Sequence, residues 1–265
     1  MPDANVVADG YRDLSPLRTR ILTHQRYSER PDDPDLDVIR AIALDGSQAL
    51  LDVGSGTGVF LGRLRAEGHT GRLCAVDASQ AAVDAAGAVA GVTATLGDAQ
   101  ELPFDAAEFD AVTARHMLYH VDDPTLAVRE ARRVLRPGGR FAAVVNRTGT
   151  TPLMAELVDT VVRRHGVRPP PGPGDRVHAG NLPEMVEEAF GACDVRTVDS
   201  ALVFHEPEPV ARYCLSTLTL RGVPGEGPLR DAVARDVEAE VRLRFAALDG
   251  VWRDPKGYVV CTGVR

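Results

Sequence analysis

Cysteine is scarce in this sequence, and its four cysteines do not form a pattern typical of a metal site or a disulfide framework. They are Cys74, Cys193, Cys214 and Cys261. No C-x-x-C pair occurs, so the zinc signature is missing and we expect no metal. Each thiol is therefore expected to be a small buried hydrophobe or a surface group in a reducing compartment.

Long apolar runs are absent as well. No segment approaches the run of about 18 apolar residues that a membrane span requires. Residues 1–9 are polar and acidic, and they lack the apolar centre of a signal peptide. We therefore expect a cytoplasmic protein without a membrane partner.

Positive charge is the third scarcity. The chain has 30 Lys and Arg residues against 38 Asp and Glu residues, which gives a formal net charge of −8. Lys256 is the only lysine, a bias that we attribute to genome composition rather than to mechanism. Because binding to phosphates requires a basic surface, this balance argues against a nucleic-acid partner.

The chain is long enough for one large α/β domain with elaborations, or for such a domain with a small cap. It has 265 residues, of which 44% are hydrophobic. Expected strands alternate with expected helices, which predicts a doubly wound, seven-stranded, mostly parallel sheet preceded by N-terminal helices. The strands are expected at residues 49–53, 72–76, 93–96, 109–114, 140–146, 194–204 and 257–264.

A helical segment near the C-terminus interrupts this alternation, between the last two expected strands. An insertion at that point is expected to lie over the ligand edge of the sheet, so we interpret it as a substrate-covering cap. The expected division is 1–44 as an N-terminal helical cap, 45–205 and 251–265 as the ligand-binding core, and 206–250 as the cap insertion.

Residues 49–58 are the stretch around which the rest of the chain is organised. Their sequence, ALLDVGSGTG, predicts a buried strand that runs directly into a glycine-rich turn. Glycines in such a turn let the chain bend sharply and let a ligand approach the backbone. Asp52 is the one charge in the strand, and a buried acid there is costly unless it binds a partner.

Two further acids follow the next two strands. Asp77 ends one strand and is placed to accept hydrogen bonds from a ribose diol. Asp98 follows the other and is placed to accept from an exocyclic amine such as that of adenine. Because ligands of open parallel sheets bind beyond the carboxyl ends of the strands, this arrangement suits adenosine.

The glycine spacing argues against a dinucleotide. The dinucleotide pattern G-x-G-x-x-G would place its last glycine at Val59, whereas the glycines here are at 54, 56 and 58. The carboxylate of Asp52 would also repel a pyrophosphate, but it would attract the cationic amine of an aminoacyl group.

Five motifs follow one another in order between residues 45 and 146. They are LLDVGSGTG at 50–58, AVDAS at 75–79, GDAQELPF at 97–104, FDAV at 109–112 and RVLRPGG at 133–139. Together they resemble class I S-adenosylmethionine-dependent methyltransferases, most of all their ubiquinone/menaquinone-biosynthesis-like, small-molecule branch. The third motif is close to the pattern GDA-x-x-LPF of that family.

The resemblance implies a Rossmann-like methyltransferase fold, S-adenosyl-L-methionine as cofactor and S-adenosyl-L-homocysteine as product. It also implies the cofactor contacts along the chain. The glycine turn would approach the methionine portion, Asp52 would lie near its amine or a bound water, and Arg115 would face its carboxylate. Asp77 would accept from the ribose hydroxyls and Asp98 from the adenine amine. The remaining implied contacts are Gly54, Ser55, Gly56 and Gly58 for methionine, and Ala78, Ser79 and Ala99 for adenine.

Three residues after the fourth strand are candidates for catalysis. His116 could act as general base on a hydroxyl or amine, since an ordinary histidine titrates near neutrality. Tyr119 could orient a substrate or line the face of the sulfonium. His120 has a structural alternative, a hydrogen bond to the backbone of its loop. Before these residues, the aromatic Tyr27 could close over the cofactor, as aromatics often do in the family, or simply pack its helix onto the sheet.

Methyl transfer from a sulfonium does not require a base, because the leaving group is neutral and alignment supplies much of the rate. The expected partner is thus a small-molecule acceptor methylated on oxygen, nitrogen or carbon, with a homodimer left open. Two alternatives remain: an RNA or protein methyltransferase, and a protein that binds S-adenosylmethionine without transferring its methyl group.

Overall fold

The structure, a computed structural model, describes residues 14–170 and 176–265. The first 13 residues of the predicted N-terminal cap lie outside these ranges. The chain forms two compact units, described separately below. We call residues 33–148, 173–198 and 258–265 the sheet unit, and residues 1–32, 149–172 and 199–257 the helical unit.

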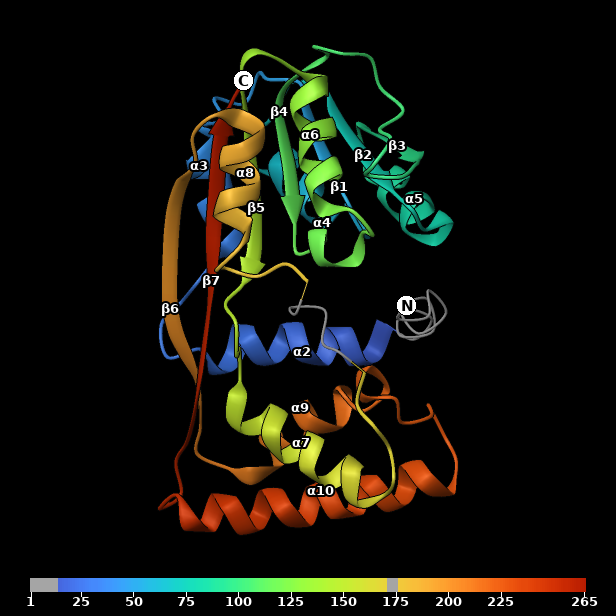
Figure 1. Ribbon diagram of the computed structural model, residues 1–265, viewed down its shortest axis with the longest axis vertical. Coiled ribbons are helices and arrows are strands. Elements are labelled where there is room, and N and C mark those ends of the chain that lie inside the picture. The colour runs from blue at the N-terminus through green and yellow to red at the C-terminus, as the bar shows by residue number, and fades with distance from the viewer. Residues whose placement is uncertain (1–13, 171–175) are drawn as a thin grey trace. The chain divides into compact units, whose positions relative to one another are not determined.

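A seven-stranded sheet with the order β3-β2-β1-β4-β5-β7-β6 confirms the predicted fold class (Figure 1). β1 to β5 pair in parallel, and β7 is antiparallel to β5. β6 and β7 contribute residues to both units. The strands are β1 Leu50–Val53, β2 Leu73–Asp77, β3 Val92–Leu96, β4 Phe109–Arg115, β5 Leu135–Asn146, β6 Asp194–Phe204 and β7 Trp252–Val264.

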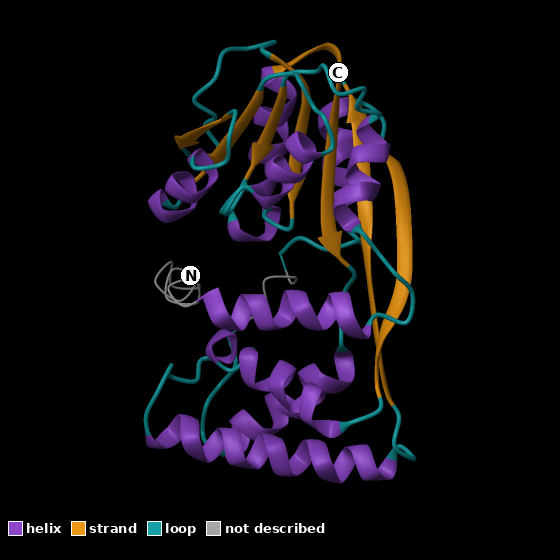
Figure 2. Ribbon diagram, turned by 180° about the vertical axis from the view of Figure 1, so that it is seen from behind, coloured by secondary structure: helices purple, strands orange, loops and turns teal. Residues whose placement is uncertain are grey.

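Helices cover both faces of the sheet (Figure 2). Successive residues of a strand point to opposite faces, so Leu50 packs in one apolar cluster and Leu51 in the other. The cluster of Leu50 includes α3 (Pro34–Ile42), α4 (Val59–Ala66) and α5 (Gln80–Gly87). The cluster of Leu51 includes α6 (Pro124–Val134) and α8 (Leu182–Phe190). Burial on both faces explains why β1 is almost uniformly apolar.

Three aspartates at the start of α3 fasten this helix to three other elements. Asp33 caps the helix by accepting from the backbone N–H of Leu36, and it pairs with Arg63 of α4 at 2.7 Å. Asp35 pairs with Arg115 at the end of β4, at 2.8 Å. Asp37 accepts from the hydroxyl of Tyr258 on β7, at 2.7 Å. Acids in the first turn also suit the helix dipole.

The helical unit has its own apolar core, formed mainly by α7 (Pro152–Arg164), α9 (Pro207–Ser216) and α10 (Pro228–Ala247). The unit also contains α2 (Leu14–Tyr27) and the short 3-10 helix η3 (Thr219–Arg221). Trp252 at the start of β7 is fully buried in this core.

The only lysine of the chain is buried in the helical unit. The side chain of Lys256 is 5% exposed, and its Nζ lies 2.7 and 2.9 Å from the two carboxylate oxygens of Asp32. The same nitrogen lies 3.4 Å from Nδ1 of His24. A compact ammonium with three donors suits three such acceptors better than the planar fork of arginine does. The position therefore has a local physical reason for lysine, beyond genome composition.

The two units divide the chain differently from the predicted domains. α3, predicted in the N-terminal cap, groups with the sheet unit, and α7, predicted in the core, groups with the helical unit. The substrate-covering role of residues 206–250 stays a prediction. Among the described helices, none combines the length and apolarity needed to cross a membrane.

Candidate functional site

The carboxyl ends of β1 to β4 bring most of the predicted residues to one edge of the sheet unit. Val53 at the end of β1 pairs with Val76 of β2 on one side and with Ala114 of β4 on the other. Asp77 at the end of β2 pairs in turn with Leu96 at the end of β3. The glycine turn therefore lies next to the segments that begin at Asp77 and Arg115, and the segment of Asp98 lies on the far side of Asp77.

The glycines of the turn serve different purposes. A Cβ on Gly54 would lie 2.6 Å from Cβ of Met117, and one on Gly58 would lie 2.9 Å from Cα of Ala86. Both positions therefore require glycine for packing. Gly56 has a positive φ of 54° and nothing within 4 Å of the position of a Cβ. The backbone at Gly56 is thus open to an approaching ligand.

Asp77 holds this open backbone in place. Its Oδ2 accepts from the N–H of Gly56 at 2.9 Å, and its Oδ1 accepts from the N–H of Ser79 at 3.0 Å. Ser79 precedes α5 and is exposed, as is Ala78. Because each carboxylate oxygen has two acceptor sites, Asp77 retains capacity for a vicinal diol.

Asp52 lies in a buried ion network rather than at an open surface. It is 0% exposed, and it accepts from Oγ1 of Thr113 at 2.7 Å and from Nη2 of Arg115 at 2.8 Å. Nη1 of Arg115 donates to Asp35, and the guanidinium stacks on Phe60 with 4.1 Å to the ring centre. Burial alone would lower the pKa of Arg115, but the two carboxylates outweigh it and raise that pKa. The guanidinium is therefore permanently charged and firmly held.

This network bears on two predicted contacts with methionine. Each guanidinium nitrogen of Arg115 already donates to a carboxylate of Asp52 or Asp35. Since a guanidinium has five N–H groups, one on Nη1 and one on Nη2 remain for the methionine carboxylate, and this contact stays a prediction. The three side chains together carry one net negative charge, which favours a cationic amine nearby.

Asp98 is exposed at the start of a tight turn, with Ala99 buried beside it. The Oδ1 atom accepts from the backbone N–H of Gln100 at 2.8 Å. The side-chain amide of Gln100 lies 3.1 Å from each carboxylate oxygen. The acid predicted for the adenine amine is thus present, but it has a side-chain partner that the sequence analysis missed.

His116 has an unusual backbone and an unusual acidity. Its φ is +50°, a left-handed conformation that is uncommon outside glycine, and its N–H donates to the carbonyl of Val144 at 2.9 Å. Burial, and then the positive charge of Arg115, lower the pKa of the imidazole to about 4. The ring is therefore neutral near pH 7, able to accept a proton but only as a weak base.

Tyr119 and His120 lie in the short 3-10 helix η1 (Leu118–His120). Their rings meet edge to face, with centres 4.6 Å apart. Burial of the His120 ring lowers its pKa, and the carboxylate of Asp77 opposes that effect. His120 is therefore close enough to interact electrostatically with Asp77, the acid predicted to bind the ribose.

Tyr27 lies in the helical unit. Its ring packs against Phe204, the last residue of β6, with 4.8 Å between ring centres. Its contact with a cofactor stays a prediction.

Comparison with known proteins decides the family. A family model described as a methyltransferase domain matches residues 51–143. A malonyl-[acyl-carrier protein] O-methyltransferase of Hahella chejuensis is 32% identical over 201 residues, which cover 70% of this chain and 68% of that protein. The chain belongs to the class I S-adenosylmethionine-dependent methyltransferases.

Other members of the methyltransferase family match over shorter stretches. A demethylmenaquinone methyltransferase of Mycolicibacterium vanbaalenii is 36% identical over 124 residues, which cover 47% of this chain and 53% of that protein. Across several curated relatives, the chain covers between 23% and 68% of the relative's length. The crystal structure of the [4+2]-cyclase SpnF aligns with a TM-score of 0.59 and 21% identity, covering 100% of this chain and 97% of SpnF. This last likeness shows the fold alone.

The residues of this methyltransferase fit the cofactor of its family. Oγ of Ser55 is buried in the glycine turn and has no hydrogen-bond partner among the described residues. A buried hydroxyl without a partner is costly, so a polar group of a ligand there would be stabilising. Together with the open backbone at Gly56 and the acids at 77 and 98, it forms a cradle for an aminoacyl nucleoside.

Three residues of the site were not predicted from the sequence: Asp35, Gln100 and Met117. Asp35 meets Arg115 across 80 positions of sequence, so no local spacing indicates their contact. Gln100 lies inside the third motif, at one of its variable positions, and Met117 reads as an ordinary apolar residue. Within the described ranges, no group of three or more His, Cys, Asp or Glu residues is arranged to hold a metal ion.

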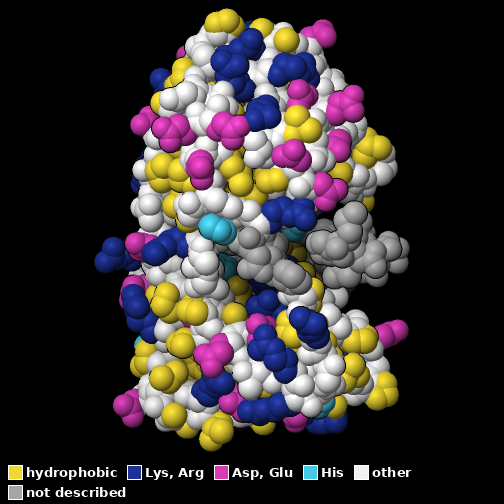
Figure 3. Space-filling view, viewed as in Figure 1, with side chains coloured by type: hydrophobic (Ala, Val, Ile, Leu, Met, Phe, Trp, Pro, Cys, Tyr) yellow, Lys and Arg dark blue, Asp and Glu magenta, His cyan; other side chains and the backbone are white. Residues whose placement is uncertain are grey.

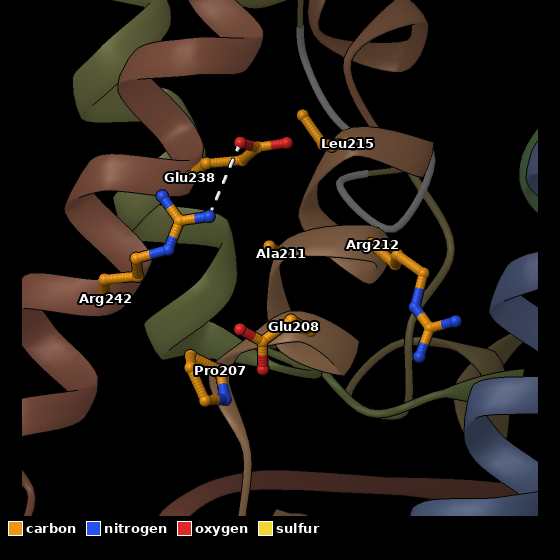
Figure 4. A pocket seen from close by; sticks show the side chains of 7 residues that line it. All are labelled: Pro207, Glu208, Ala211, Arg212, Leu215, Glu238 and Arg242. Carbon is orange, nitrogen blue, oxygen red and sulfur yellow. Dashed lines mark ion pairs between the residues drawn. The ribbon is translucent and has the colours of Figure 1, made fainter.

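The surfaces beyond the site are of mixed charge. Figure 3 shows acidic and basic side chains interspersed on the face of the sheet unit in view. In the helical unit, α9 and α10 line a groove of about 370 Å³ (Figure 4). Glu208 and Arg212 of α9 and Glu238 and Arg242 of α10 contribute both signs of charge to it. Neither surface presents the continuous basic face of a nucleic-acid binder.

Proposed function

We propose that the protein transfers the methyl group of S-adenosylmethionine to an oxygen, nitrogen or carbon atom of a small molecule. The observation that carries the proposal is the open glycine turn, whose backbone is held by Asp77. Membership of the methyltransferase family and the second acid, Asp98, support it.

The cofactor supplies, when bound, an electrophilic methyl group on a positively charged sulfur. Gly56 and Ser55 would hold the aminoacyl portion, Asp77 the ribose and Asp98 the adenine. The net negative charge of Asp35, Asp52 and Arg115 would stabilise the α-ammonium.

Neutral His116 is the candidate to receive a proton from the acceptor. With a pKa of about 4, it is suited to an acceptor that is itself acidic, or to orienting an acceptor that needs no base. The relatives named above include an O-methyltransferase and a demethylmenaquinone methyltransferase. Both names favour a small-molecule or carrier-bound acceptor over a nucleic acid, and the net charge of −8 points the same way.

The ribose assignment can be tested by calorimetry with S-adenosylmethionine. Asp77→Ala should weaken binding at least tenfold, about 1.4 kcal/mol. Asp84→Ala is a matched control, because it removes an exposed carboxylate of α5 whose hydrogen-bond partner among the described residues is Gln80, and it should change affinity less than twofold. Unchanged affinity in Asp77→Ala would overturn the ribose assignment.

The transfer itself can be tested by incubating the protein with methyl-labelled cofactor and a panel of small hydroxyl, amine and carboxyl compounds. Label in a small-molecule product is the expected result. Label in RNA or protein would instead favour an RNA or protein methyltransferase. Tight cofactor binding with no labelled product on any acceptor would favour a protein that binds S-adenosylmethionine without transferring its methyl group.

A further inference from the structure

Gln100 forms a bridge between the acid of the adenine-type site and the N-terminus of α6. Its amide nitrogen lies 3.1 Å from both carboxylate oxygens of Asp98. Its amide oxygen accepts from the backbone N–H of Asp123 at 2.8 Å. Asp123 is itself the N-cap of α6 and accepts from the N–H of Leu126.

Chemistry leaves one orientation for this amide. A carboxylate only accepts and a backbone N–H only donates, so the nitrogen must face Asp98 and the oxygen must face Asp123. The side chain is thus held at both ends, and it in turn fixes the rotation of the Asp98 carboxylate.

The contacts to Asp98 can be counted against its capacity. An ionised carboxylate has about four acceptor sites, two on each oxygen. The amide nitrogen of Gln100 lies equally far from the two oxygens, so one of its N–H groups is shared between them. Oδ1 also accepts from the backbone N–H of Gln100. Among the described residues, Oδ2 has this shared contact alone, so it keeps acceptor capacity for a ligand.

We propose that Gln100 is a positioning residue that orients the Asp98 carboxylate toward an N–H donor on the purine ring of the cofactor. The proposal rests on the function proposed above, and it assigns a role to a residue that does not itself need to touch the ligand. By holding the carboxylate through its backbone N–H and a shared side-chain N–H, Gln100 keeps the exposed carboxylate from rotating freely and leaves Oδ2 to accept from the 6-amino group. A charge-assisted hydrogen bond depends strongly on such alignment.

The test compares two ligands by calorimetry: S-adenosylhomocysteine, and its analogue with purine in place of adenine, which lacks only the 6-amino group. The wild-type protein should bind S-adenosylhomocysteine at least fivefold more tightly than the analogue. Gln100→Ala should weaken binding of S-adenosylhomocysteine about fivefold and change binding of the analogue less than twofold. The ratio of the two affinities should therefore fall toward one.

Gln48→Ala is the matched control. The side-chain oxygen of Gln48 accepts from the N–H of Asp45, so this variant also removes an amide contact to the backbone, but before β1 rather than after β3. It should leave both affinities unchanged. Thermal unfolding of both variants checks that they are folded.

The possible results distinguish a failure of the positioning role of Gln100 from a failure of the proposed function. Equal weakening of both ligands in Gln100→Ala, or no weakening of either, would overturn the positioning role. A wild-type protein that binds both ligands equally would overturn it as well, together with the adenine assignment of Asp98. A wild-type protein that binds neither ligand would overturn the proposed function.

Discussion

Among single residues, His116 departs from ordinary behaviour in both its backbone conformation and its acidity. Its pKa of about 4 lies below the usual value of about 6.5, because the ring is buried beside the guanidinium of Arg115. The neutral form is therefore present at every pH above about 4. We expect the acid limb of a pH–rate profile that depends on neutral His116 to fall near pH 4, and not near pH 6.5.

The variant His116→Ala should lower kcat by more than it weakens cofactor binding. His205→Ala removes an exposed imidazole after β6 and serves as the control for general loss of a histidine. The opposite pattern, weak cofactor binding with normal turnover, would make His116 a cofactor contact.

The stability of the protein should fall with pH over the same range as the activity. Because the pKa of His116 is lowered in the folded protein, the contribution of its neutral ring to the free energy of unfolding is complete above about pH 6.5. It is lost as the pH falls toward about 4.

At the scale of elements, α7 depends on a carboxylate from a distant strand. Thr151, the residue before the helix, makes no side-chain cap hydrogen bond. Asp254 of β7 replaces it by accepting from the backbone N–H groups of Leu153 and Met154, at 3.1 and 2.9 Å. The same carboxylate accepts from Nε1 of Trp252 at 3.2 Å. A fully buried acceptor with three donors holds the start of the helix to the strand.

Asp254→Ala should lower the free energy of unfolding by about 2 kcal/mol or more, because it leaves three buried donors without an acceptor. Denaturant unfolding followed by tryptophan fluorescence measures this free energy. Because Trp252 is the only tryptophan, the signal reports on the surroundings of Asp254. Asp236→Ala, which removes an exposed partner of His165, should cost about 0.5 kcal/mol or less. Equal effects of the two substitutions would contradict the capping role.

The elements themselves were largely predictable, but β7 begins at Trp252 rather than at residue 257, and β5 also begins early. The residues 136–139, Arg-Pro-Gly-Gly, indicate the end of a helix, so we expected the strand to begin at residue 140. It begins at Leu135 instead. The N–H of Gly138 donates to the carbonyl of Arg265, and the N–H of Arg265 donates to the carbonyl of Gly139. Leu135 pairs with Phe109 of β4. Long-range pairing thus extends a strand whose local sequence favours a turn.

For the whole molecule, hydrogen exchange can show which of the two compact units binds the cofactor, because a bound ligand protects the backbone amides around it. All predicted cofactor contacts except Tyr27 lie in the sheet unit. S-adenosylhomocysteine at 100 times its Kd should stabilise the protein by about 2.7 kcal/mol. Hydrogen exchange should show added protection at residues 53–58, 77–80 and 98–101. Protection confined to the helical unit would contradict the assignment.

The fold class, the glycine turn and the acids at the ends of the next two strands could all be predicted from the amino-acid sequence. These features are local: the apolar pattern of each segment indicates its element, and each acid lies at the carboxyl end of its own strand or just beyond it. Parallel pairing then necessarily brings the strand ends together.

Contacts between side chains, in contrast, became visible only in the folded chain. Arg115 binds Asp52 and Asp35, Lys256 binds Asp32 across 224 positions, and Gln100 holds Asp98 and Asp123 together. Such pairs depend on distances between segments that are remote in sequence, and no residue spacing specifies them. The same reason explains the acidity of His116: its pKa is set by burial and by a neighbouring charge, and both exist only in the folded chain.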